Sequence, residues 1–175
     1  MTETRIIQVE DYQIDNKLQK NKYADVQIYM ALQFNAQTNF TFIILTYSIQ
    51  MILYAQQYPK TIIFRDINLQ FLENPVEVTI ITCPSIITNQ QLNRDRSLKL
   101  MKQRIDNIMT LIKSLDADVA IFGAFGCEGN SADPQFVAQC FKENINNNRC
   151  CKRNIFAIEA DENVQAFKHV FESDN

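Results

Sequence analysis

The chain has 175 residues, which is long enough for one domain with a hydrophobic core. Its hydrophobic share of 46% and its charged share of 21% are ordinary for a soluble globular protein. The formal net charge of −3 excludes a strongly basic surface, so we expect no nucleic-acid partner. The single histidine, His169, argues against a Ser-His-Asp triad and against a metal site built from several histidines.

The cysteines and the N-terminus both favour an intracellular protein. The five cysteines are an odd number and show neither C-x-x-C nor Cys/His ligand spacing, so we expect reduced, mostly buried thiols, no bound metal and no cofactor. The opening stretch "MTETRIIQVEDYQIDN" lacks the apolar core of a secretory signal and is too acidic for a transit peptide. We expect a cytoplasmic location by default, with an organelle or a cytoskeletal assembly left open.

The first 75 residues give mixed signals about secondary structure. Residues 25–34, 39–47 and 60–66 could each form a strand, and residues 48–57 could form a short helix. The apolar run Phe40–Ala55 contains several polar residues and is shorter than the roughly 20 residues that a membrane-spanning helix needs. We therefore expect a buried strand followed by a packed helix there, and no membrane span.

The last 100 residues alternate between strand and helix patterns. Strands are predicted at Val76–Pro84, Val119–Phe125 and Ile155–Ala160. Asp133 and Pro134 predict the start of one helix and Asp161 the start of the last. Between the first two strands, a long amphipathic helix is predicted from the helical spacing of Leu98, Met101, Ile105, Ile108, Ile112 and Leu115. Its basic residues are expected mainly on a solvated face, a partner-docking role being the alternative: Arg94, Arg96, Lys99, Lys102 and Arg104.

This alternation predicts an α/β fold with a mixed, mostly parallel sheet in a layered arrangement. No linker and no internal repeat divides the chain, so we expect a single domain overall. Within it, we interpret residues 54–175 as the core and residues 1–53 as a divergent N-terminal segment that packs on the same domain.

All three glycines of the chain lie in one stretch, "FGAFGCEGNSADP" at 122–134. Because ligands bind at the carboxyl ends of parallel strands, the backbone amides of this stretch and the following helix could hold an anion or a phosphate. The alternative is a tight strand-to-helix turn that needs glycine only for its geometry.

The same stretch carries a resemblance to a known family. The segments "VEVTIITCPSII", "RIDNIM", "DVAIFGAFGCEGNSADPQFVAQCFKENI" and "IFAI", with "YPKTIIFRD" upstream, resemble the C-terminal half of the microbial-type poly(ADP-ribose) glycohydrolase domain, which has the macrodomain fold. The resemblance covers roughly residues 54–160 and implies a three-layer α/β fold whose loop surrounds the diphosphate of ADP-ribose. The ligand-binding residues that it implies are Gly123, Ala124, Phe125, Gly126, Cys127 and Asn130.

Two departures from the family pattern bear on activity. The family places a G-G-G loop and a Gln-Glu-Glu segment before the matched region, but no glycine precedes Gly123 and no such glutamate pair occurs here. We therefore expect no catalytic residue. Glu128 stands where the family has a further glycine, and a carboxylate about 4 Å from a phosphate costs on the order of 1 kcal/mol in water and more in a pocket.

Three hypotheses about function follow. The chain is interpreted first as a non-catalytic, degenerate macrodomain that serves as a structural or assembly subunit, with other protein subunits as its partners. The second hypothesis is a module that still binds ADP-ribose or another nucleotide without cleaving it, in which Phe125 either stacks on the ligand or ends a strand as a core residue. An active ADP-ribosyl glycohydrolase with a relocated carboxylate is the third and least favoured.

Overall fold

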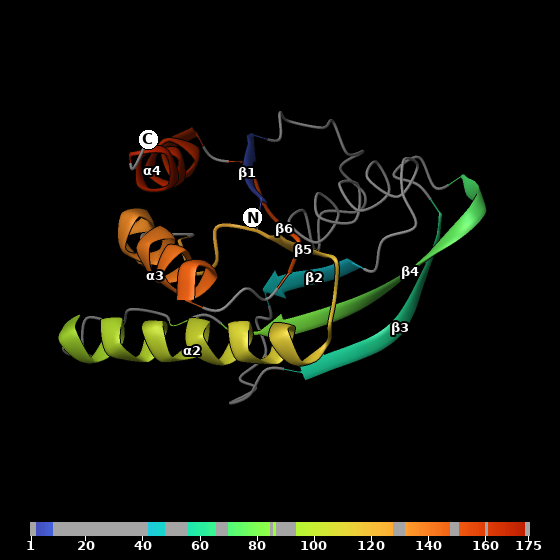
Figure 1. Cartoon of the computed structure of the whole chain (residues 1–175), viewed down its shortest axis with the longest axis horizontal. Coiled ribbons are helices and arrows are strands. Elements are labelled where there is room, and N and C mark those ends of the chain that lie inside the picture. Colours follow the sequence, from blue (N-terminus) through green and yellow to red (C-terminus); the bar gives the residue numbers. More distant parts are fainter. Residues whose placement is uncertain are drawn as a thin grey trace.

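The computed structural model describes residues 3–8, 42–47, 56–65, 70–84, 86, 94–127, 132–147, 151–159 and 161–173. In this part of the chain, six strands form one sheet in the order β1-β6-β5-β2-β4-β3 (Figure 1). The strands are β1 (Glu3–Gln8), β2 (Phe42–Tyr47), β3 (Gln56–Arg65), β4 (Phe71–Cys83), β5 (Val119–Phe122) and β6 (Arg153–Ile158). The helices are α2 (Arg94–Ser114), α3 (Pro134–Asn147) and α4 (Asp161–Glu172).

The sheet is mixed and mostly parallel, as predicted. β1 pairs with β6, β6 with β5, β5 with β2, and β2 with β4, all in parallel register. Only β3 and β4 pair antiparallel among the described strands. Since parallel neighbours need crossover connections, the order of the strands in space differs from their order along the chain.

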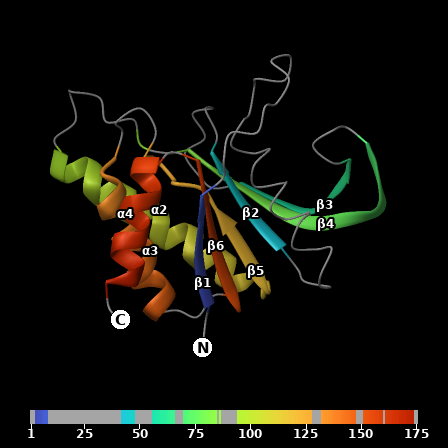
Figure 2. The same ribbon diagram turned by 90° about the horizontal axis from the view of Figure 1, so that it is seen from above.

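The described helices lie on one side of the sheet, where they cover a continuous hydrophobic core (Figure 2). β5 is buried along its whole length, with Val119 and Ile121 on one face and Ala120 and Phe122 on the other. Burial on both faces is what a central strand of a layered α/β fold requires. The predicted α/β class is confirmed.

A cluster of aromatic rings joins the sheet to α3 and α4. Phe156 on β6 lies at its centre, with its ring centroid 5.0 Å from that of Phe122 and 5.3 Å from that of Phe141. Phe167 and Phe171 of α4 each lie 5.2 Å from the same ring. Aromatic pairs at this spacing are each favourable beyond the area they bury, by about 0.5–1.5 kcal/mol.

The helices agree closely with the sequence pattern. Of the residues predicted on the buried face of α2, Met101, Ile105, Ile108 and Ile112 are buried, while Leu98 and Leu115 are partly exposed near its ends. Val164, Phe167 and Val170 of α4 are buried as predicted, and Phe171 packs against the core while remaining partly exposed.

Several strand predictions need correction. Gln56 and Gln57 were predicted to end a helix but belong to β3, because they pair with Thr82 and Ile81 of β4, and this long-range pairing overrides local helix preference. β4 begins at Phe71 rather than at Val76, since Phe71 pairs with Arg65 of β3. β5 ends at Phe122 because the chain turns immediately after it.

β1 was not predicted at all, and it pairs with β6 across its full length, from Glu3 opposite Arg153 to Gln8 opposite Ile158. β1 and β2 both come from the segment 1–53 and are strands of the sheet. The predicted strand at 25–34 and residues 48–55 of the predicted helix lie outside the described residues. Among the described helices, none is both long and apolar enough to cross a membrane.

We predict that Phe156→Ala lowers the free energy of unfolding by about 3–5 kcal/mol, because it removes the ring that the other four contact. Urea unfolding followed by circular dichroism measures this loss. Phe71→Ala is the control, since Phe71 is 72% exposed and its removal leaves no buried cavity. A loss below about 1 kcal/mol for Phe156→Ala would contradict the central position of this ring.

Candidate functional site

The candidate site is the loop Gly123–Cys127, which follows β5 at the carboxyl edge of the sheet. Parallel pairing brings the carboxyl ends of β1, β2, β4, β5 and β6 to this edge. The chain then continues to the N-terminus of α3 at Pro134. In α/β sheets of this kind, ligands bind outside the carboxyl ends of the strands.

The loop is held by hydrogen bonds within its own backbone. The amide of Phe125 donates to the carbonyl of Gly123 at 2.9 Å, and the amide of Cys127 donates to the carbonyl of Ala124 at 3.0 Å. Gly126 has a φ of 75°, in the left-handed region that a residue with a Cβ atom occupies only at a cost. This loop conformation therefore favours glycine at position 126.

Two side chains of the loop point into the protein rather than toward a ligand. Phe125 is 5% exposed and Cys127 is 7% exposed, and both belong to the hydrophobic core. The Cys127 thiol also donates to the Phe125 carbonyl at 3.8 Å. Phe125 thus has the position of a core aromatic residue at the end of a strand, and its ring is not placed to stack on a ligand.

A ligand at this loop would therefore contact backbone groups rather than the side chains of Phe125 and Cys127. Gly123 and Ala124 are partly exposed, while Gly126 is buried. The amides of Phe125 and Cys127 already donate within the loop, so the amides of the partly exposed Gly123 and Ala124 are the candidates for contact with an anion. Asn130, the sixth expected ligand-binding residue, and Glu128 lie outside the described residues.

Asp133 caps α3 as the sequence predicts. Its carboxylate Oδ1 accepts a hydrogen bond from the amide of Gln135 at 3.0 Å, and its carbonyl accepts one from the amide of Val137 at 3.1 Å. The cap satisfies one of the amides that a helix leaves unpaired at its start. The positive end of the α3 dipole still points toward the loop side of the sheet.

β4 ends at Cys83, so Cys83 and Pro84 lie at the same carboxyl edge of the sheet. The carbonyl of Pro84 accepts a hydrogen bond from the Arg104 guanidinium and a weak one from the Cys83 thiol at 3.7 Å. Burial raises the pKa of Cys83, although the charge of Arg104 opposes that shift. Cys83 is therefore a protonated thiol at neutral pH and a poor nucleophile.

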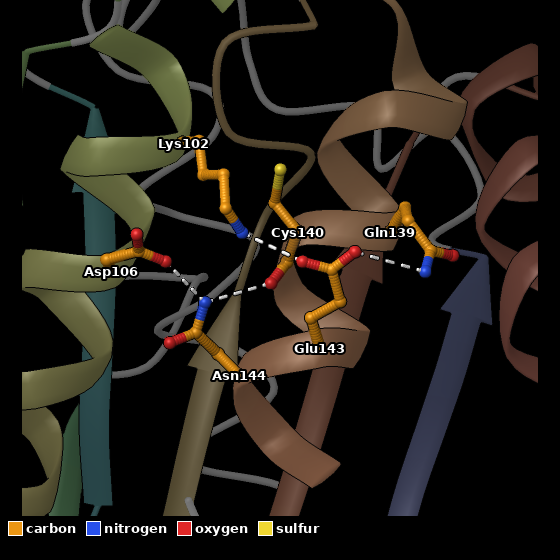
Figure 3. Close-up of polar contacts among 6 residues, drawn as sticks. All are labelled: Lys102, Asp106, Gln139, Cys140, Glu143 and Asn144. Carbon is orange, nitrogen blue, oxygen red and sulfur yellow. Dashed lines mark hydrogen bonds and ion pairs between the residues drawn. The ribbon is translucent and has the colours of Figure 1, made fainter. Parts of the chain in front are cut away.

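A second polar cluster joins α2 to α3, away from the loop (Figure 3). Lys102 donates to Glu143 Oε2 at 2.8 Å, and Gln139 donates to Glu143 Oε1 at 3.4 Å. Asn144 Nδ2 donates both to Asp106 Oδ1 at 2.7 Å and to the Cys140 carbonyl at 3.0 Å. We name these residues the α2–α3 clamp: Lys102, Asp106, Gln139, Cys140, Glu143 and Asn144.

The protonation states in the clamp indicate a structural role. The hydrogen bond from Lys102 lowers the pKa of Glu143, and the same bond raises the pKa of Lys102. Burial raises the pKa of Cys140 to about 11, so its thiol stays protonated at neutral pH. Two of these contacts, Gln139–Glu143 and Cys140–Asn144, have the i, i+4 spacing that a helix sequence indicates, whereas the two contacts between the helices have no local signal in the sequence.

Arg94, Arg96 and Lys99 are exposed, as expected of a solvated face. Lys102 and Arg104 are partly exposed and also contact Glu143 and the Pro84 carbonyl.

The described residues offer little to a metal or to thiol chemistry. None of their His, Cys, Asp and Glu side chains gather in groups of three or more that could hold a metal ion. The structure describes Cys83, Cys127, Cys140 and Cys151, and all four are buried.

We predict that Gly126→Ala lowers the free energy of unfolding by about 1–2 kcal/mol, because alanine must adopt the positive φ that glycine occupies freely. Gly123→Ala is the matched control: it also adds one methyl group to the loop, but Gly123 does not have a positive φ. Urea unfolding of both variants measures the difference. Equal losses in the two variants would contradict a special conformational role for Gly126.

We also predict that the clamp weakens in acid. Glu143 has a lowered pKa, so its contribution is present above its ordinary value of 4.5 and is lost as the pH falls through the folded value. Because the Glu143 side chain is 46% exposed, Glu143→Gln should cost only about 0.2–1 kcal/mol at pH 7. Unfolding titrations from neutral pH into the acid range should show this difference shrink to zero below the folded pKa. Glu172→Gln, at the exposed end of α4, is the control, and a pH-independent difference would contradict the ion pair.

Known structures share this fold, although sequence comparisons alone do not find it. No family model matches the chain, and no curated protein matches it significantly. The poly(ADP-ribose) glycohydrolase of Deinococcus radiodurans, solved in complex with ADP-ribose, matches over 99% of this chain and 86% of its own, with a TM-score of 0.74 and 17% identity. The apo form of the same enzyme matches over 68% of this chain and 53% of its own, with a TM-score of 0.59 and 26% identity.

The corresponding enzyme of Thermomonospora curvata matches over 97% of this chain and 77% of its own, with a TM-score of 0.73 and 14% identity. The similarity therefore extends beyond the C-terminal half in which the sequence motifs were found, and it rests on backbone arrangement far more than on residue identity. The resemblance inferred from the glycine stretch is confirmed: this chain has the macrodomain-like α/β fold of the microbial poly(ADP-ribose) glycohydrolases.

Proposed function

We propose that this chain binds ADP-ribose, or a related nucleoside diphosphate, at the loop Gly123–Cys127 without hydrolysing it. The observation that carries the proposal is the conformation of this loop: it leaves β5 at the carboxyl edge, passes Gly126 at a φ of 75° and leads to the N-terminus of α3. The fold is that of an enzyme whose structure contains ADP-ribose.

The chemistry of the loop suits a phosphate better than an uncharged ligand. Backbone amides and the positive end of a helix dipole favour negative charge without any basic side chain. Gly123 and Ala124 are partly exposed and carry little or no side chain, so a diphosphate can approach their backbone closely. Recognition of this kind tolerates the loss of most other family residues.

The absence of hydrolysis is supported by the placement of the glutamates that precede Gly123, which are Glu3, Glu10, Glu73 and Glu77. A general acid or base must lie within hydrogen-bond reach of the bond that it acts on. Glu3 forms ion pairs with Arg5 and with Arg153, at the amino ends of β1 and β6 and thus at the opposite edge of the sheet from the loop. Glu73 and Glu77 are exposed on β4. Glu10 lies outside the described residues, and no glycine precedes Gly123 to form the family's catalytic loop.

A second candidate is a degenerate macrodomain that no longer binds a nucleotide and serves as a structural subunit, with other protein subunits as partners. The observation that favours it is the carboxylate of Glu128, which follows the loop directly in sequence. Negative charge there would oppose a diphosphate by on the order of 1 kcal/mol or more. The two candidates differ in whether the chain binds ADP-ribose, and one titration measures that.

The test is calorimetric titration of the purified chain with ADP-ribose. We expect binding with a Kd below about 1 mM, which corresponds to roughly 4 kcal/mol. Ala124→Asp adds a carboxylate at a partly exposed position of the loop and should weaken binding at least about tenfold. Gln103→Glu introduces the same charge on the exposed surface of α2 and should leave the affinity unchanged.

The remaining outcomes separate the two candidates. Glu128→Gly should strengthen binding if the carboxylate only opposes the ligand. Should Glu128→Gly bind while the natural chain does not, the loop is a blocked phosphate site and the structural-subunit hypothesis is favoured. If neither binds at millimolar ADP-ribose, the binding proposal is wrong. Release of ADP-ribose from poly(ADP-ribose) by the natural chain would overturn the non-catalytic part.

A further inference from the structure

We draw no further inference here: the strongest candidate, the exposed apolar patch of Ile62, Phe64 and Phe71 on the β3–β4 pair, carries no proposal because nothing in the structure shows what covers it.

Discussion

The parallel pairing of β2 with both β4 and β5 is the constraint on which the rest of the described structure depends. β2 bonds to β5 from Phe42 opposite Val119, and to β4 from Phe42 opposite Val78. It thereby joins the β3–β4 pair to the strands that the helices cover. Because all of these strands run in the same direction, their carboxyl ends share one edge, and the loop after β5 lies on that edge. A one-residue change of register in β2 would exchange its two faces.

The loop after β5 and the β3–β4 pair differ in how the chain holds them. The loop Gly123–Cys127 is anchored from within, since Phe125 and Cys127 pack in the core and two backbone hydrogen bonds close its turns. The groups that the loop exposes are therefore mainly backbone groups, which depend little on side-chain identity. The β3–β4 pair is the opposite case: Ile63, Val76 and Val78 are buried, whereas Ile62, Phe64 and Phe71 expose their side chains. A fold shared at 17% identity can keep a surface made of backbone groups far more easily than one made of particular side chains.

The α2–α3 clamp shows how polar groups can be structural. Lys102 and Glu143 are about half exposed, so their ion pair contributes little to stability. Asn144 is buried and donates hydrogen bonds to Asp106 of α2 and to the Cys140 carbonyl of α3. The buried amide sets the relative position of the two helices more than the ion pair does. Cys140, with its pKa raised to about 11, lies in the same cluster as an inert thiol.

Local patterns in the sequence determined the helices, the cap at Asp133 and the α/β class, because helical spacing, capping residues and β-branched runs act over a few neighbouring residues. The glycine stretch also identified the loop, since only glycine takes a φ of 75° freely. The tertiary structure alone decided what depends on distant partners. β1 exists through its pairing with β6, and Gln56 and Gln57 form a strand because β4 lies beside them. Phe125 turned inward and Phe64 outward although both are phenylalanine, because burial is set by which surfaces the long-range strand pairing brings together.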